Sequence, residues 1–266
     1  MKIEALSLAE MRTHRSEKWR GFPSDVLPLF VAEMDFPVAK PIQDLLIEMV
    51  SHSDMGYLSS IPELGEAFAG FAKRRWNWEL IPGQVRLCTD VGVGMVEVLR
   101  VTTQPGDKVL INSPIYQNFY NWIKETKVEL IDVPFIQNDL NWSLDFEAIE
   151  KVYAAGLKAH ALCHPHNPLG RIFSREELSR IADLAKKYGV TVISDEKRFQ
   201  NSASVFLSKR GAAFHSSRRA FKRSPVAFQF SDRARDSASA TIFSFSTMIC
   251  SRRAALAAAS AAFFAS

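Results

Sequence analysis

The sequence predicts an α/β fold with a mainly parallel sheet covered by helices on both faces. From about residue 40 to residue 196, short apolar runs alternate with segments of helical periodicity, which is the rhythm of β–α units. The runs are continuously apolar, as is typical of strands buried on both faces. With 266 residues, of which 47% are hydrophobic and 23% charged, the chain is long enough to bury a substantial core.

Five apolar runs are the predicted strands: Val85–Thr89, Lys108–Asn112, Val128–Phe135, His160–His164 and Val190–Ser194. In parallel sheets of this kind, ligands bind at the carboxyl ends of the strands. We therefore expect functional residues directly after the strands, in four segments: Asp90–Gly94, Ser113–Tyr116, Pro165–Arg171 and Asp195–Glu196.

Two helices are predicted most clearly. KPIQDLLIEMVSH begins at Lys40 and has Pro41 in its first turn. Its apolar residues lie on one helical face: Ile42, Leu45, Leu46, Met49 and Val50. SREELSRIADLAKKYG begins with a capping box made by Ser174 and Glu177, and Gly189 ends it.

Composition excludes some classes of protein. No run of 18 apolar residues exists, so no membrane span is predicted. The first 20 residues lack the apolar core of a secretory signal, which argues against export. Cys88, Cys163 and Cys250 are widely spaced and form no CxxC pair, which favours reduced thiols. We expect a cytoplasmic protein.

Charge divides the chain at Lys197. Residues 197–266 contain 12 Lys and Arg against 2 acidic residues, whereas the preceding part contains 21 basic and 27 acidic residues. Only 1 of the 12 glycines and 1 of the 12 prolines fall in this tail, in which Ser, Ala, Arg and Phe dominate. Nucleic-acid binding is disfavoured, because the tail has no recognisable module and the acidic remainder opposes a polyanion.

Two segments after predicted strands could bind a cofactor. In DVGVGMVEVLR, Gly92 and Gly94 let the backbone approach an anion, towards which the first N–H groups of a helix would point. The alternative is a simple strand-to-helix turn. In SPIYQNFY, Tyr116 could present its ring to a flat cofactor, or could be a core tyrosine at a helix start.

Two further segments carry polar side chains at strand ends. In CHPHNPLGR, two prolines and a glycine bracket Asn167 in a rigid turn, where its amide can donate to a ligand. His164 and His166 are not at metal-ligand spacing with a third ligand, so no metal is predicted. Asp195 ends an apolar strand, where it could cap a helix, form a salt bridge or act as counter-ion to a protonated ring nitrogen.

In this order, the motifs resemble those of the pyridoxal-phosphate enzymes of the class I/II aminotransferase superfamily (fold type I, the aspartate-aminotransferase fold). LPLFVAEMDFP (Leu27–Pro37) and MGYLSSIPEL (Met55–Leu64) are similar to the cystathionine β-lyase-like, or C–S β-lyase, branch. The resemblance runs from about Lys18 to Glu196. It implies three parts: an N-terminal arm and small-domain segment (1–39), an incomplete pyridoxal-phosphate-binding domain (40–196) and a basic tail outside the family pattern (197–266).

The resemblance also implies residue roles. The cofactor phosphate would be held by the backbone amides of Gly92, Val93 and Gly94. Tyr57 matches the family tyrosine that reaches the phosphate of a neighbouring subunit, which implies a homodimer.

Three side chains would contact the cofactor ring, again by resemblance. Tyr116 would stack on it, Asn167 would donate to its phenolic oxygen, and Asp195 would keep its nitrogen protonated. The substrate would be an amino acid, for which the branch favours β-elimination from a sulfur-containing compound over transamination. The motifs themselves fit both reactions, since both begin at the same α-carbon.

The family pattern is lost after Glu196. Lys197 and Arg198 stand where the branch has Ile-His, and no lysine after Asp195 lies in the Ser-x-Ser-Lys context of the family's Schiff-base lysine. These lysines are Lys197, Lys209 and Lys222, and SASAT has Ala240 where a lysine is expected. No catalytic residue is therefore identified, and a catalytically inactive remnant is the alternative to an active enzyme.

The abrupt change motivates the hypothesis that the reading frame was disrupted near codon 197, and the alternative is a genuine diverged tail with its own role. The coding DNA tests it, because a single-base shift should then restore the lysine motif and the C-terminal domain.

Overall fold

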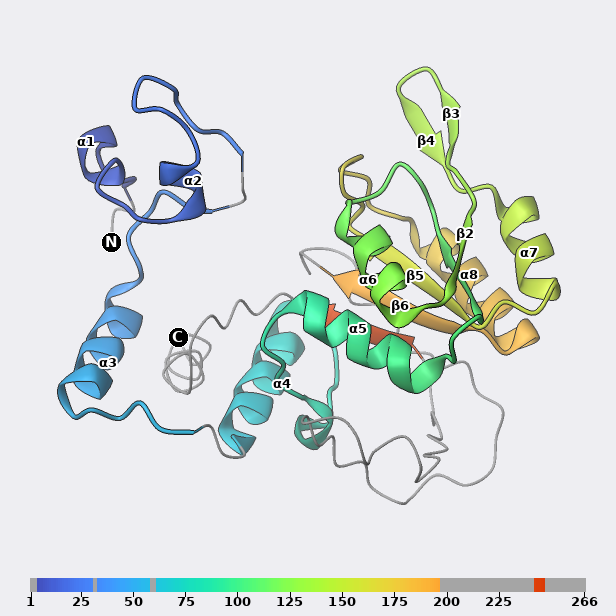
Figure 1. Ribbon diagram of the computed structural model, residues 1–266. Coiled ribbons are helices and arrows are strands. Elements are labelled where there is room, and N and C mark those ends of the chain that lie inside the picture. Colours follow the sequence, from blue (N-terminus) through green and yellow to red (C-terminus); the bar gives the residue numbers. More distant parts are fainter. Residues whose placement is uncertain (1–3, 31–32, 58–60, 197–241, 247–266) are drawn as a thin grey trace. The chain divides into compact units, whose positions relative to one another are not determined.

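The computed structural model describes residues 4–30, 33–57, 61–196 and 242–246, and the chain divides into two compact units (Figure 1). The first unit contains the described residues up to Leu64, with helices α1 (Leu8–Met11), α2 (Glu17–Arg20) and α3 (Lys40–Ser51). The second unit begins at Gly65, within α4 (Pro62–Trp76), and contains the sheet.

A five-stranded sheet with the order β2-β1-β5-β6-β7 forms the centre of the second unit. Its strands are β1 (Lys108–Ile111), β2 (Glu129–Asp132), β5 (Ala159–His164), β6 (Thr191–Glu196) and β7 (Ile242–Ser246). Every neighbouring pair in it is parallel. The predicted parallel sheet is thus confirmed. A separate antiparallel hairpin is formed by β3 (Ile136–Asn138) and β4 (Asn141–Ser143).

Helices cover both faces of this sheet, as predicted (Figure 1). One face packs against α5 (Val91–Thr102) and α6 (Asn118–Thr126), and the other against α7 (Phe146–Ala154) and α8 (Arg175–Tyr188). Successive strand residues alternate between the two cores. Val109, Ala161 and Ile193 belong to the α5/α6 core, whereas Leu110, Leu162 and Val192 belong to the α7/α8 core.

Both clearly predicted helices are present. In α8 the capping box of Ser174 and Glu177 is complete, and Gly189 ends the helix with a φ of 69°. Helix α3 forms where predicted, but none of its residues is buried. Four residues of its apolar face are half-buried (Ile42, Leu45, Leu46 and Met49), whereas Ile47 and Val50 are exposed.

The strand predicted at Val85–Thr89 is wrong. The segment follows the short 3-10 helix η1 (Pro82–Gln84) without regular structure, and the side chains of residues 85–89 are half-buried or exposed. A short apolar run becomes a strand only when a neighbouring strand takes up its backbone hydrogen bonds, which local sequence does not reveal. In the same way, the run predicted to extend to Phe135 ends as a strand at Asp132.

Candidate functional site

Three of the predicted site residues come together at the carboxyl ends of neighbouring strands. The backbone N–H of Tyr116 donates to the carbonyl of Asn167 at 2.9 Å, which joins the loop after β1 to the loop after β5. The N–H of Asn167 contacts Cys163 Sγ at 3.4 Å. Cys163 lies opposite Asp195 in the register of β5 and β6. Contacts between adjacent strands and loops therefore connect Tyr116, Asn167 and Asp195.

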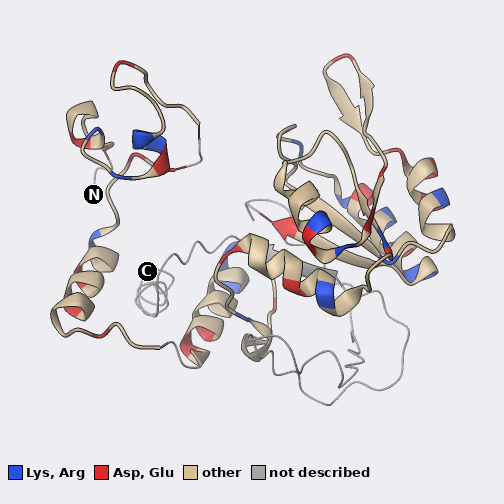
Figure 2. Ribbon diagram, in the orientation of Figure 1, with Lys and Arg blue, Asp and Glu red and all other residues tan. Residues whose placement is uncertain are grey.

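Asp195 is buried at the end of β6, with 0% of its surface exposed. Since Ile193 belongs to the α5/α6 core and side chains alternate along a strand, Asp195 lies on the α5/α6 face. Figure 2 shows the acidic end of β6, formed by Asp195 and Glu196. Burial strongly disfavours a carboxylate unless a cation or hydrogen-bond donors stabilise it.

The adjacent carboxyl group of Glu196 lies on the opposite, α7/α8 face. It is also buried, and the Ser194 hydroxyl donates to its Oε1 at 2.7 Å. Burial raises the pKa of Glu196 to about 7. The two consecutive acidic residues thus have separate surroundings, and only Asp195 faces the helix that begins with the glycine motif.

Helix α5 begins at this glycine motif with Asp90 as its N-cap. The Val93 N–H donates to Asp90 Oδ1 at 2.8 Å, and the Gly94 N–H donates to the Asp90 carbonyl at 3.0 Å. Of the predicted phosphate-binding amides, those of Val93 and Gly94 are therefore engaged within the helix start. The N–H groups of Val91 and Gly92 donate to no described residue, as expected for the first turn of a helix.

The Asn167 turn is closed by two short backbone hydrogen bonds. Gly170 N donates to His166 O, and His166 N donates to Arg171 O, each at 2.7 Å. Gly170 has a φ of 65°, a conformation that favours glycine. Arg171 is anchored to α8 by an ion pair with Glu177 at 2.6 Å. No hydrogen bond joins the side-chain amide of Asn167 to another residue of the described ranges.

His164 and His166, which flank Pro165, are buried among aromatic rings. The His164 ring stacks on Phe173 with 5.2 Å between centroids, and the His166 ring meets the Phe135 ring at 4.7 Å. Burial lowers the pKa of each histidine to about 4, so both are neutral near pH 7. No cluster of three or more His, Cys, Asp or Glu suited to a metal occurs in the described ranges.

The remaining predictions concern residues elsewhere. Tyr57 lies in the first unit, where its side chain is fully exposed. Lys197, Lys209, Lys222 and Ala240 lie outside the described residues, and so does the predicted break at codon 197. Strand β7 comes from the basic tail outside the family pattern, and no motif in the sequence pointed to it.

Sequence reasoning missed two residues near the site, Cys163 and Trp122, and it included Asp90 in the site without its role as the N-cap of α5. Asp90 has a visible signal, because an aspartate before a helix is a frequent N-cap. Cys163 and Trp122 carry no signal in the sequence. The Cys163 sulfur contacts the N–H of Asn167, and Trp122 packs between α5 and α6, and both contacts depend on the fold.

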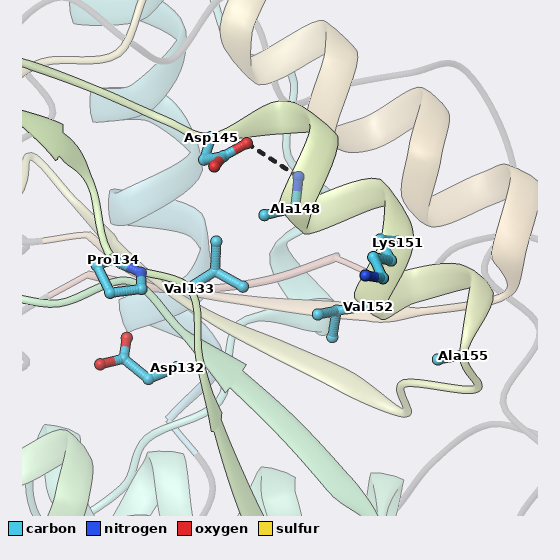
Figure 3. A pocket seen from close by; sticks show the side chains of 8 residues that line it. All are labelled: Asp132, Val133, Pro134, Asp145, Ala148, Lys151, Val152 and Ala155. Atoms are coloured by element: carbon cyan, nitrogen blue, oxygen red, sulfur yellow. Dashed lines mark hydrogen bonds between the residues drawn. The ribbon is translucent and has the colours of Figure 1, made fainter.

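A cavity of about 410 Å³ lies away from these residues, beside α7 (Figure 3). Its two carboxylates already accept backbone hydrogen bonds: Asp145 from the Ala148 N–H at 2.9 Å, and Asp132 from the Ser113 N–H at 3.0 Å. None of the predicted site residues lines it. The cavity is therefore separate from the candidate site. Across the described ranges, no helix is both long and apolar enough to cross a bilayer.

The chain is similar to a family model and to curated relatives of the same kind. The family model described as aminotransferase class I and II matches residues 25–197. A putative cystathionine β-lyase of Mycobacterium tuberculosis (strain CDC 1551 / Oshkosh) is 38% identical over 204 residues, which cover 73% of this chain and 49% of the relative. A cystathionine β-lyase of Bacillus subtilis (strain 168) is 32% identical over 174 residues, covering 65% of this chain and 45% of the relative.

The structural comparison agrees. The crystal structure of cystalysin from Treponema denticola, which contains a pyridoxal 5'-phosphate cofactor, matches with a TM-score of 0.69 and 26% identity. The match covers 75% of this chain and 52% of that protein. The chain thus spans about half the length of the curated relatives that it matches.

Proposed function

Because the chain belongs to the class I and II aminotransferase family, we propose that it binds pyridoxal phosphate at the carboxyl ends of β1, β5 and β6 and acts in C–S β-elimination from a sulfur-containing amino acid. The names of its relatives support this activity and substrate class. Of the predicted cofactor-binding domain, residues 40–196, the part from Gly65 onward contains β1, β5 and β6.

The residues present fit the cofactor. When bound, pyridoxal phosphate supplies an electron sink for negative charge at the α-carbon of the substrate. The open N–H groups of Val91 and Gly92 at the start of α5 suit its phosphate. The Asn167 amide would donate to its phenolic oxygen, and Tyr116 would stack on its ring. The hydrogen bond from the Tyr116 N–H to the Asn167 carbonyl supports a shared role for the two residues.

The burial of Asp195 is the observation that carries this proposal. A carboxylate with no exposed surface, on the same face as α5, holds a proton on a ring nitrogen far better than an exposed one, since water does not screen the pair. Glu196 is equally close in sequence, but it faces the other side of the sheet and takes no part.

The pair of carboxyl groups supplies a matched test. Asp195→Asn should weaken the binding of pyridoxal phosphate at least tenfold, because the amide cannot stabilise the protonated nitrogen. Glu196→Gln keeps an acceptor for Ser194 and should leave binding unchanged. Affinity is measured by absorbance titration of the purified chain. Equal losses in both variants would mean that the buried carboxyl groups act only in folding, and would refute the assignment.

The reaction itself is tested with cystathionine. Release of pyruvate and a free thiol supports β-elimination, whereas conversion of a 2-oxo acid into an amino acid supports transamination. A chain that binds the cofactor but performs neither reaction corresponds to the inactive alternative, which the missing Ser-x-Ser-Lys motif favours.

The lysine that attaches the cofactor needs a direct experiment. Borohydride reduction of the loaded protein followed by peptide mapping identifies any modified lysine among Lys197, Lys209 and Lys222. If none is modified, the chain as written lacks the catalytic lysine, in agreement with a disrupted frame after residue 196.

We also propose a homodimer in the cytoplasm. Helix α3 exposes apolar side chains that a second copy would cover, with Ile47 60% and Val50 62% exposed, and Tyr57 is available to reach a partner. Cys88 and Cys163 are free thiols, which suits a reducing compartment. Sedimentation of the wild type and of Val50→Asp distinguishes a dimer from a monomer.

A further inference from the structure

Trp122 lies in the second turn of α6, with its indole nitrogen against the first turn of α5. A Cβ atom on Gly92 would lie 2.8 Å from Trp122 Nε1 and 3.1 Å from Asp90 Oδ1. Real Cβ atoms do not approach other atoms within 3.0 Å, so the indole reaches this position only because residue 92 is glycine. The indole nitrogen of Trp122 therefore lies against the α-carbon side of Gly92, in the first turn of α5.

Packing holds the indole in this orientation. The Trp122 ring contacts the fully buried Phe119 ring with 4.9 Å between centroids, and it meets the Tyr116 ring edge-on at 6.5 Å. Its N–H donates to no described residue, and the side chain is only half-buried. A tryptophan N–H usually has an acceptor when it is in a packed environment. The Trp122 N–H is not among the buried donors without an acceptor, so a ligand at the helix start can still reach it.

We propose that Trp122 is a phosphate-binding residue of this chain, donating its indole N–H to a phosphate oxygen of the cofactor beside the amides of Val91 and Gly92. This inference rests on the proposed binding of pyridoxal phosphate. An indole N–H is a donor only, so it cannot compete with the anion for donors. The contact of Trp122 with Tyr116 also links the phosphate end of the site to the ring that stacks on the cofactor.

The charge at this end of the site makes a further donor useful. Asp90 places a carboxylate at the start of α5 and occupies the Val93 N–H, so it both repels a phosphate and removes one amide. The Trp122 N–H adds a neutral hydrogen-bond donor, and its protonation does not change with pH. The indole N–H of Trp122 thus partly replaces the Val93 N–H, which Asp90 occupies, as a donor to the phosphate.

A pair of ligands isolates the phosphate contribution. Pyridoxamine 5'-phosphate and pyridoxamine differ only in the phosphate, and neither requires attachment to a lysine. Calorimetric titration of the full chain gives the affinity for each ligand. Trp122→Phe keeps an aromatic ring but removes the N–H, and should lower the affinity for pyridoxamine 5'-phosphate about tenfold while leaving that for pyridoxamine unchanged.

Two further variants complete the experiment. Trp142→Phe changes a half-buried tryptophan on the β3–β4 hairpin and should alter neither affinity. Gly92→Ala displaces the indole and should reproduce the selective loss for the phosphorylated ligand, provided that its circular dichroism spectrum matches the wild type.

The outcomes distinguish a failure of the Trp122 role from a failure of the proposed cofactor binding. If Trp122→Phe weakens both ligands equally, or neither, Trp122 does not bind the phosphate, whereas the proposed function stands as long as the wild type prefers the phosphorylated ligand. If the wild type binds neither ligand, both the cofactor site and the role of Trp122 are refuted.

Discussion

Acidification should destabilise the second unit through His160, which is buried beneath the site. Its Nε2 lies 2.8 Å from Asn112 Oδ1, and its Nδ1 lies 2.8 Å from the Tyr153 hydroxyl. The Asn112 amide nitrogen donates to the Val133 carbonyl, so its oxygen must accept from His160. The ring is therefore protonated at Nε2 and accepts from Tyr153 at Nδ1. This network joins Asn112, which directly follows β1 and precedes the Tyr116 loop, to the start of β5 and to α7.

The magnitude follows from the pKa of His160, which burial lowers to about 3. In the unfolded chain a histidine has a pKa of about 6.5. Between these values the unfolded state binds a proton that the folded state does not, so stability falls as the pH decreases through this window. The slope is about 1.4 kcal/mol per pH unit for one histidine. From pH 7 to pH 5, His160 alone should cost about 2 kcal/mol of unfolding free energy.

The assay compares urea unfolding at pH 7 and pH 5 for the wild type and His160→Gln. Glutamine offers one donor and one acceptor but does not titrate, so the variant should lose about 2 kcal/mol less than the wild type on acidification. His52→Gln, at an exposed position after α3, serves as the control and should keep the wild-type pH dependence. An identical loss in wild type and His160→Gln would refute the view that this histidine is neutral because it is buried.

Two other predictions concern the ends of helices. Asp90→Asn retains the cap on Val93 but removes the negative charge, and should strengthen the binding of pyridoxamine 5'-phosphate a few-fold at low salt. Calorimetry at low and high salt measures this effect, and an unchanged low-salt affinity would contradict it. Ser174→Ala removes the cap of α8 and should cost about 1 kcal/mol of stability in urea unfolding. An unchanged unfolding midpoint would show that Glu177 alone holds this helix start.

Features that depend on neighbouring residues were correctly predicted from the sequence. The capping box of Ser174 and Glu177, the end of α8 at Gly189 and the parallel sheet all involve interactions or patterns within a few residues or one β–α unit. The order of the motifs was sufficient for the family, which the match to residues 25–197 confirms. The individual roles of Tyr116, Asn167 and Asp195 stay predictions, although contacts between their loops and strands bring them together.

Other features were decided only by the tertiary structure. The failure of Val85–Thr89 to form a strand and the addition of β7 depend on which backbone groups find partners across the sheet. The opposite surroundings of Asp195 and Glu196 depend on which helices cover each face.

The sequence by itself determined the kind of protein and the segments that build its site, because caps, turns and periodicity act over short distances along the chain. The approach of Trp122 to Gly92, separated by 30 positions in the numbering, came only from the packing of α6 against α5. Contacts of this type require the whole fold, since each side chain is placed by residues that are distant in sequence.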